Sequence, residues 1–237
     1  MSNPTTKAAS FRLKVCGIRT MEDVQACADA GVDCVGLNFY RPSVRYLDPL
    51  AEETQAINSL ASQCGLYRVG LFVNESIETV QEIAKQLQLD AVQFHGDETV
   101  EYVQQFLRVG IAVIRAIRLP TVPMEAGAIH SHVERWIDPS VTMLIDADAG
   151  AQFGGGGKQL HWPSIAAWAR QYAEPLNLPW ILAGGLTPQC VSEAKRVSTA
   201  GRVDVASGVE NPRGTKSAAL IREFVQACGP GGVDETA

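Results

Sequence analysis

Eight short runs of apolar, often β-branched residues alternate along the 237-residue chain with longer stretches of helical periodicity. Apolar runs of about four to eight residues are typical of strands buried on both faces of a parallel sheet. The predicted strands are 12–17, 34–39, 69–73, 91–95, 112–117, 142–146, 180–183 and 203–207. The predicted helices between them are 20–30, 50–62, 76–87, 98–107, 125–135, 163–172, 188–197 and 216–227.

Capping residues support several of these helices. Thr20 precedes a first turn that has an acidic residue three positions on, and Gly31 can end the same helix. Ser76 can cap the third helix, while Pro163 and Pro188 suit first-turn positions of the sixth and seventh.

Strand–helix units in series, with no break in composition, predict an α/β fold with one domain over residues 11–228. A (β/α)8 TIM barrel is favoured, because a barrel typically takes ~250 residues. A doubly wound open sheet has the same local alternation and remains the alternative. Residues 1–10 and 229–237 lie outside the alternation, and we expect them to be flexible ends.

Composition and charge limit the functions to consider. A net charge of −6 argues against general affinity for nucleic acid or an anionic membrane, so any site for an anion must be locally positive. Six cysteines without C-x-x-C spacing favour reduced thiols and a cytoplasmic location. Four histidines without metal-ligand spacing predict no metal site. We also expect no secretory signal and no membrane-spanning segment.

Glycine-rich turns follow the last three predicted strands, at 154–158, 183–187 and 206–209. Glycine lets the backbone come close to a ligand, and free N–H groups bind phosphate. In barrels, a phosphate site commonly forms from the loops after the seventh and eighth strands. These turns therefore predict phosphate binding, with simple loop flexibility as the alternative.

Two ionisable side chains close predicted strands at this same end. Cys16 shares a strand face with Lys14, whose ammonium could increase the thiolate fraction. A thiolate can act as a nucleophile or a general base, although a small buried apolar residue is the commoner role of a cysteine. Asp146 ends an apolar run and is a candidate general acid. Asp148 has the same strand parity, and spacing does not separate the two.

Two further residues follow predicted strands. Arg45, in the segment 41–46, is either a solvated loop residue or a fork for a substrate carboxylate, which arginine suits better than lysine. His95 could be a ligand, a base or a core residue.

Eight short motifs, taken in order, resemble the phosphoribosylanthranilate isomerase family of tryptophan biosynthesis. They are 14–18 (KVCGI), 42–46 (PSVRY), 69–74 (VGLFVN), 92–97 (VQFHGD), 144–146 (LID), 154–158 (GGGGK), 182–186 (LAGGL) and 205–210 (VASGVE). Each motif alone is weakly specific, but all of them in order at barrel-consistent spacing are specific.

The resemblance implies a (β/α)8 barrel that uses no metal or organic cofactor. Its implied reaction is the Amadori rearrangement of N-(5-phosphoribosyl)anthranilate to 1-(2-carboxyphenylamino)-1-deoxyribulose 5-phosphate. It implies that Cys16 is the general base, that Asp146 is the general acid and that Arg45 binds the anthranilate carboxylate. The substrate-binding residues expected in all are Arg45, His95, Gly156, Gly184, Gly185, Asp204, Ser207 and Gly208. A small-molecule substrate is the expected partner, and the chain is expected to be a monomer or a homodimer.

Other barrels provide the rival interpretations. The related histidine-pathway isomerase would carry aspartate at the position of Cys16, and indole-glycerol-phosphate synthase would carry a Lys-x-Ser-Pro-Ser motif that this chain lacks. A non-catalytic phosphate-binding barrel would need neither Cys16 nor Asp146. A second sugar-phosphate isomerisation by the same site stays open. Gly156 also departs from the family, where serine or threonine is usual, and His161 stands where aspartate is frequent.

Overall fold

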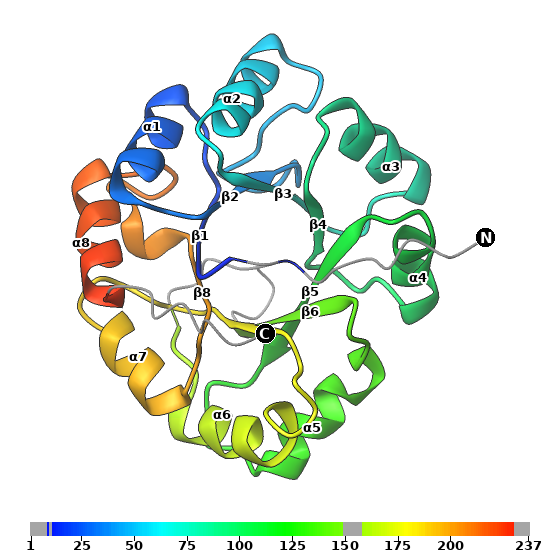
Figure 1. The fold of residues 1–237 in the computed structure, drawn as a ribbon, viewed down its shortest axis with the longest axis vertical. Coiled ribbons are helices and arrows are strands. Elements are labelled where there is room, and N and C mark those ends of the chain that lie inside the picture. The colour runs from blue at the N-terminus through cyan, green and yellow to red at the C-terminus, as the bar shows by residue number, and fades with distance from the viewer. Residues whose placement is uncertain (1–8, 10, 149–157, 230–237) are drawn as a thin grey trace.

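A computed structural model describes residue 9, residues 11–148 and residues 158–229 of the chain. Its parallel strands close into a barrel in chain order, with β8 paired to β1, and helices surround the barrel (Figure 1). The strands are β1 (Leu13–Cys16), β2 (Cys34–Asn38), β3 (Tyr67–Phe72), β4 (Ala91–Phe94), β5 (Ala112–Leu119), β6 (Val141–Ala147), β7 (Trp180–Leu182) and β8 (Val203–Val205). The predicted barrel is confirmed, and the open sheet is wrong.

Each described strand is followed by an α-helix, as the alternation predicted. The helices are α1 (Met21–Ala30), α2 (Glu52–Gln63), α3 (Ile77–Gln86), α4 (Val100–Arg108), α5 (Ala126–Val133), α6 (Trp162–Trp168), α7 (Val191–Ser198) and α8 (Ala218–Cys228). Short turns of other helix types follow α5, α6 and β8, namely η1 (Glu134–Trp136), η2 (Ala169–Ala173) and η3 (Ser207–Val209).

The predicted caps are mostly confirmed. Thr20 forms a complete capping box with Asp23, Gly31 ends α1 in the left-handed conformation, and Ser76 caps α3. Pro163 lies in the first turn of α6. The prediction for Pro188 is wrong, because residues 188–190 form a separate turn before α7 begins at Val191.

The barrel interior has a closed end and an open end. Alanine, valine, leucine and isoleucine side chains from alternate strand positions fill the interior, and they pack with Ala9 and Phe11 at the N-terminal ends of the strands. The Ala9 amide donates to Thr142 Oγ1 at 3.2 Å, and Arg202 Nη1 donates to the Ala9 carbonyl at 2.8 Å. Space for a ligand is therefore expected at the opposite, C-terminal ends of the strands.

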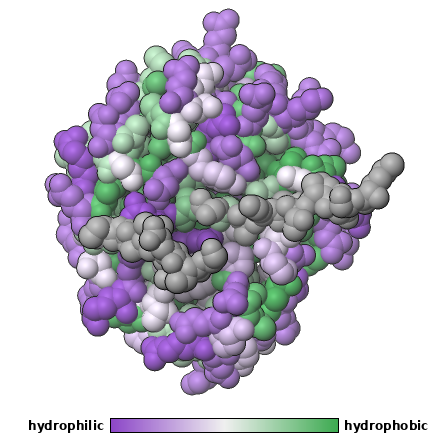
Figure 2. Space-filling view, viewed as in Figure 1, coloured by the Kyte–Doolittle hydropathy of each residue, from purple (hydrophilic) through white to green (hydrophobic). Residues whose placement is uncertain are grey.

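The outer layer packs the helices on the sheet. The largest cluster of buried apolar side chains lies between strands and helices and includes Trp168, Phe106 and Phe224. Figure 2 shows hydrophilic side chains around the periphery of the face seen in Figure 1. Among the described residues, no helix combines the length and apolar character needed to cross a membrane.

Candidate active site

A cavity of about 60 Å³ lies at the C-terminal ends of the strands. The predicted site residues that line it are Cys16, Arg45, His95, Asp146, Gly184, Gly185, Asp204 and Ser207. Gly208 lies beside the cavity without lining it, and Gly156 lies outside the described residues. The barrel thus brings together, at one mouth, side chains that the sequence places on separate strand ends.

Cys16 lies beside a buried ion pair inside the barrel. Lys14 is fully buried, and its ammonium donates to Asp204 Oδ1 at 2.8 Å, across the pairing of β1 with β8. A methyl group added to Gly36 would lie 2.8 Å from Cys16 Sγ and 3.1 Å from Lys14 Nζ, so both groups reach over the same glycine. The shared strand face of Lys14 and Cys16 is therefore confirmed.

The pKa of the Cys16 thiol reflects opposed effects. Burial raises the pKa of Cys16, the Lys14 ammonium lowers it, and the Asp204 carboxylate raises it again. The net direction is upward. The predicted help from Lys14 is present, but the cost of burying a thiolate outweighs it.

Asp146 is the second-last residue of β6, and its carboxylate is buried at the cavity. Its Oδ1 accepts a hydrogen bond from the Ala147 amide at 2.8 Å, and its Oδ2 lies 3.2 Å from His95 Nε2. Asp148, which the sequence could not separate from Asp146, is exposed and does not line the cavity. The structure therefore selects Asp146 as the carboxylate that can reach a ligand.

His95 lies between Gln93 and Asp146. Gln93 Nε2 lies 3.3 Å from His95 Nδ1. On the other side of the ring, His95 Nε2 lies 3.2 Å from Asp146 Oδ2, and within the described chain this contact does not have the geometry of a hydrogen bond.

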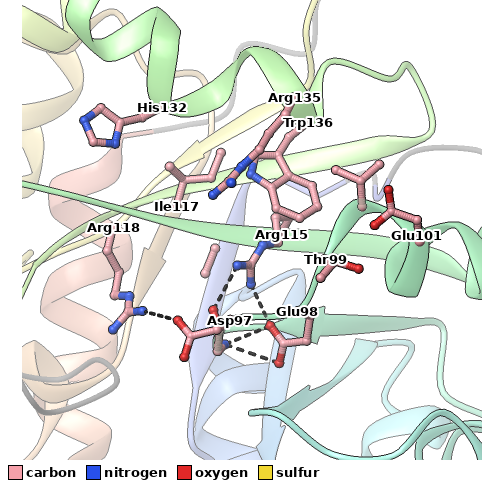
Figure 3. A pocket seen from close by; sticks show the side chains of 13 residues that line it. Asp97, Glu98, Thr99, Glu101, Arg115, Ile117, Arg118, His132, Arg135 and Trp136 are labelled. Carbon is pink, nitrogen blue, oxygen red and sulfur yellow. Dashed lines mark hydrogen bonds and ion pairs between the residues drawn. The ribbon is translucent and has the colours of Figure 1, made fainter.

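The backbone on either side of His95 is held by the Arg115–Glu98 pair, whose hydrogen bonds are drawn in Figure 3. Arg115 of β5 donates to the carbonyls of Phe94 and Gly96, which flank His95, and to Glu98 Oε2, all at 2.8–3.0 Å. Glu98 in turn accepts from the Gly96 amide at 3.0 Å. Both members of this Arg115–Glu98 pair are buried, so the pair fixes the backbone on either side of His95.

Figure 3 also shows a second cavity, outside the barrel between the start of α4 and η1. It is larger than the mouth cavity, at about 480 Å³. None of the predicted site residues lines it, and two of its arginines, Arg115 and Arg118, already pair with Glu98 and Asp97. The ionisable side chains that line it, rather than its volume, identify the mouth as the candidate active site.

Arg45 is buried and paired, so the solvated-loop alternative is wrong. Its Nε and Nη2 donate to the two carboxylate oxygens of Glu210 at 2.6 and 2.8 Å. Lys216 Nζ donates to Glu210 Oε1 at 2.8 Å. Glu210 and Lys216 were not among the predicted site residues. Glu210 ends the motif at 205–210, but it lies beyond β8, where strand parity gives no direction.

The turns after β7 and β8 present free backbone amides. Gly184 and Gly185 have φ angles of +85° and +62°, which favour glycine. A methyl group at Gly208 would overlap the Leu186 carbonyl oxygen, so the two turns can approach only because Gly208 has no side chain. Within the described chain, the amides of Gly184, Gly185 and Ser207 donate no hydrogen bond and are available to an anion.

Barrels with ionisable side chains gathered at this mouth form a large group of enzymes, and the chain has the architecture of that group of (β/α)8-barrel enzymes. In the described residues, no three histidine, cysteine, aspartate or glutamate side chains group closely enough to hold a metal ion.

Comparison with known proteins gives the family. The model of the family described as N-(5'phosphoribosyl)anthranilate (PRA) isomerase matches residues 13–227. An N-(5'-phosphoribosyl)anthranilate isomerase of Neisseria meningitidis serogroup B is 38% identical over 215 residues, which cover 91% of this chain and 95% of the relative. The chain belongs to the N-(5'-phosphoribosyl)anthranilate isomerase family.

Solved structures agree with this assignment. The phosphoribosylanthranilate isomerase of Thermotoga maritima has a TM-score of 0.78 and 30% identity, covering 92% of this chain and 98% of that one. The Thermotoga maritima enzyme is described as dimeric. A further phosphoribosylanthranilate isomerase structure, with a TM-score of 0.74, 29% identity and the same coverage, is a complex with reduced 1-(o-carboxyphenylamino)-1-deoxyribulose 5-phosphate.

Proposed function

We propose that Cys16 and Asp146 are the base and the acid with which this chain isomerises N-(5'-phosphoribosyl)anthranilate. The reaction is that of the family, a step of tryptophan biosynthesis. The observation that carries the two roles is that this thiol and this carboxylate line one cavity beside the free amides of the β7 and β8 turns.

The chemistry needs one proton donor and one proton acceptor. Asp146 gives its proton to the furanose ring oxygen, and the ring opens to an iminium ion. The Cys16 thiolate then removes the proton from C2, which leaves an enolamine. A proton from solvent adds to C1, the C2 hydroxyl loses its proton, and the ketone forms. Exchange with solvent returns Asp146 to the acid and Cys16 to the thiolate.

The other predicted residues bind the substrate or hold a catalytic side chain in position. The amides of Gly184, Gly185 and Ser207 hold the phosphate, together with Gly208 and with Gly156 from the segment that the structure does not describe. Arg45 binds the anthranilate carboxylate. Asp204, fixed by Lys14, accepts a hydrogen bond from a sugar hydroxyl, and His95 orients Asp146.

The proposal is tested by the loss of fluorescence of freshly made phosphoribosylanthranilate in the presence of EDTA. We expect a loss proportional to the protein and unaffected by EDTA. Cys16→Ala and Asp146→Asn should each lower kcat by at least about 100-fold, with nearly unchanged binding of a reduced product analogue. A wild-type kcat in either variant would show that its residue is not the acid or the base.

If folded protein causes no loss of phosphoribosylanthranilate fluorescence beyond spontaneous decay, the proposed function is wrong. The histidine-pathway substrate is then the next to test, since a second sugar-phosphate isomerisation by this site stays open. We also propose a cytoplasmic monomer or homodimer that needs no nucleic acid, membrane or cofactor. Sedimentation of the purified protein decides between monomer and dimer.

A further inference from the structure

The guanidinium of Arg45 has two edges that can each bind a carboxylate through paired N–H donors, Nε with Nη2 and Nη1 with Nη2. Glu210 occupies the first edge, at 2.6 and 2.8 Å. Within the described chain, Nη1 donates no hydrogen bond. Because Arg45 lines the mouth cavity, one carboxylate-binding edge of its guanidinium is left for a ligand.

Glu210 is itself held in place. Its side chain is 1% exposed, and its two oxygens accept from Lys216 Nζ at 2.8 Å and from the Gly214 amide at 2.9 Å. Lys216 Nζ also donates to the carbonyl of Ala206, a residue that lines the cavity. Glu210 therefore has no alternative partner in solvent, and it cannot turn away from Arg45 without leaving buried donors unpaired.

The charges of the three side chains do not cancel. Arg45 and Lys216 are two cations around one carboxylate, which leaves a net charge of about +1 beside the cavity. Burial disfavours the charged form of Glu210, but Arg45 and Lys216 outweigh it and lower its pKa to about 2. A ligand with one carboxylate would neutralise the group.

The stem of Arg45 is fixed as well. Its methylene groups cross Gly17, which follows Cys16, and a methyl group at Gly17 would overlap Arg45 Cδ. Gly17 has a φ of +81°, a conformation that favours glycine. Arg45 is thus held at its stem by the β1 turn and at its head by Glu210.

We propose that Glu210, anchored by Lys216, is a positioning residue that occupies the Nε/Nη2 edge of Arg45 and presents the Nη1/Nη2 edge to the anthranilate carboxylate. The inference rests on the proposed function, and it assigns roles to Glu210 and Lys216, which the proposed function does not use. Without Glu210 the guanidinium keeps its charge but loses its orientation, so recognition of the carboxylate weakens while the acid and the base stay in place.

The experiment compares two ligands in each variant. The first is reduced 1-(o-carboxyphenylamino)-1-deoxyribulose 5-phosphate, and the second is the same molecule without the ring carboxylate. In the wild type we expect the first to bind at least about tenfold more tightly, as measured by calorimetry. In Glu210→Gln the ratio of the two dissociation constants should fall toward one. The KM for phosphoribosylanthranilate should rise, and kcat should stay within about threefold of wild type.

Two further variants make the comparison specific. Arg45→Lys keeps the positive charge but has no pair of parallel N–H donors. Its two dissociation constants should therefore become nearly equal, as in Glu210→Gln. Glu193→Gln, at a carboxylate that is 65% exposed on α7, is the matched control and should keep the wild-type ratio. If Glu210→Gln does not fold, as judged by circular dichroism, Arg45→Lys and Lys216→Met carry the test.

The outcomes separate this inference from the proposed function. A wild-type ligand ratio in folded Glu210→Gln would overturn the positioning role, even if the isomerase assay succeeds. A wild type that binds the two ligands equally would overturn both the positioning role and the carboxylate role of Arg45. Failure of the wild type to isomerise phosphoribosylanthranilate would instead refute the proposed function.

Discussion

Cys16 shows how one residue can be both well placed and poorly ionised. Burial is the largest influence on its thiol and raises the pKa, while the Lys14 ammonium acts against burial and Asp204 acts with it. At neutral pH the protonated thiol therefore dominates. Since only the thiolate can take a proton from C2, the fraction of Cys16 that can act as the base should grow as the pH rises.

The rate should follow that ionisation. We expect the ratio of kcat/KM in the wild type to kcat/KM in Cys16→Asp to increase by up to about tenfold per pH unit between about pH 6 and 9. In Cys16→Asp the base is ionised well below this range, and the contribution of Asp146 is common to both proteins, so the ratio reports the ionisation of Cys16. Cys64→Ser changes a half-buried thiol outside the cavity and should keep the wild-type slope. A ratio that does not change with pH would mean that a different group titrates.

At the scale of elements, the turn after β7 and the short η3 helix after β8 form one surface. Gly208 comes so close to the Leu186 carbonyl that no side chain fits between them. Gly184, Gly185 and Ser207, whose amides donate no hydrogen bond within the described residues, line the same cavity beside this approach. Phosphate binding should therefore depend on the contact between the two turns rather than on either turn alone.

Gly208→Ala separates these turns. We expect the Kd for inorganic phosphate to rise by about tenfold or more, equivalent to about 1.4 kcal/mol, in a calorimetric titration. Gly201→Ala is the control, because a methyl group there would meet nothing within 4 Å. Phosphate affinity in Gly208→Ala equal to that of the control would remove the β8 turn from the phosphate site.

The whole molecule separates stability from chemistry along the barrel axis. The N-terminal ends of the strands are closed by packed apolar side chains that include Phe11, while the ionisable groups lie at the other end. Phe11 is 7% exposed, and its ring centroid lies 5.8 Å from that of Tyr67. Such residues should affect the free energy of unfolding without affecting the rate.

Phe11→Ala tests this separation. We expect the free energy of unfolding, measured with urea, to fall by about 3 kcal/mol because a cavity forms in the closed end. The value of kcat/KM should not change. Leu176→Ala, at a residue that is 55% exposed, should change stability by no more than about 0.5 kcal/mol. A loss below about 1 kcal/mol in Phe11→Ala would show that the closed end contributes little.

Local features of the chain were enough to predict the order of strands and helices, and closure of the barrel decided against the open sheet. The alternation of apolar runs and helical periods, the caps at Thr20, Gly31 and Ser76, and the shared face of Lys14 and Cys16 are all confirmed. Each depends on residues a few positions apart, whose spacing is set by strand and helix geometry. The placement of candidate residues at strand ends followed from the same spacing, because parallel strands end at one rim.

The pairings at the site could not be predicted, because they join residues far apart in the chain. Lys14 meets Asp204 across 190 positions, and Arg45 meets Glu210 across 165. Only closure of the barrel, with β8 against β1, brings these groups together. The choice of Asp146 over Asp148 and the raised pKa of Cys16 also depend on burial, which is a property of the surrounding packing rather than of neighbouring residues.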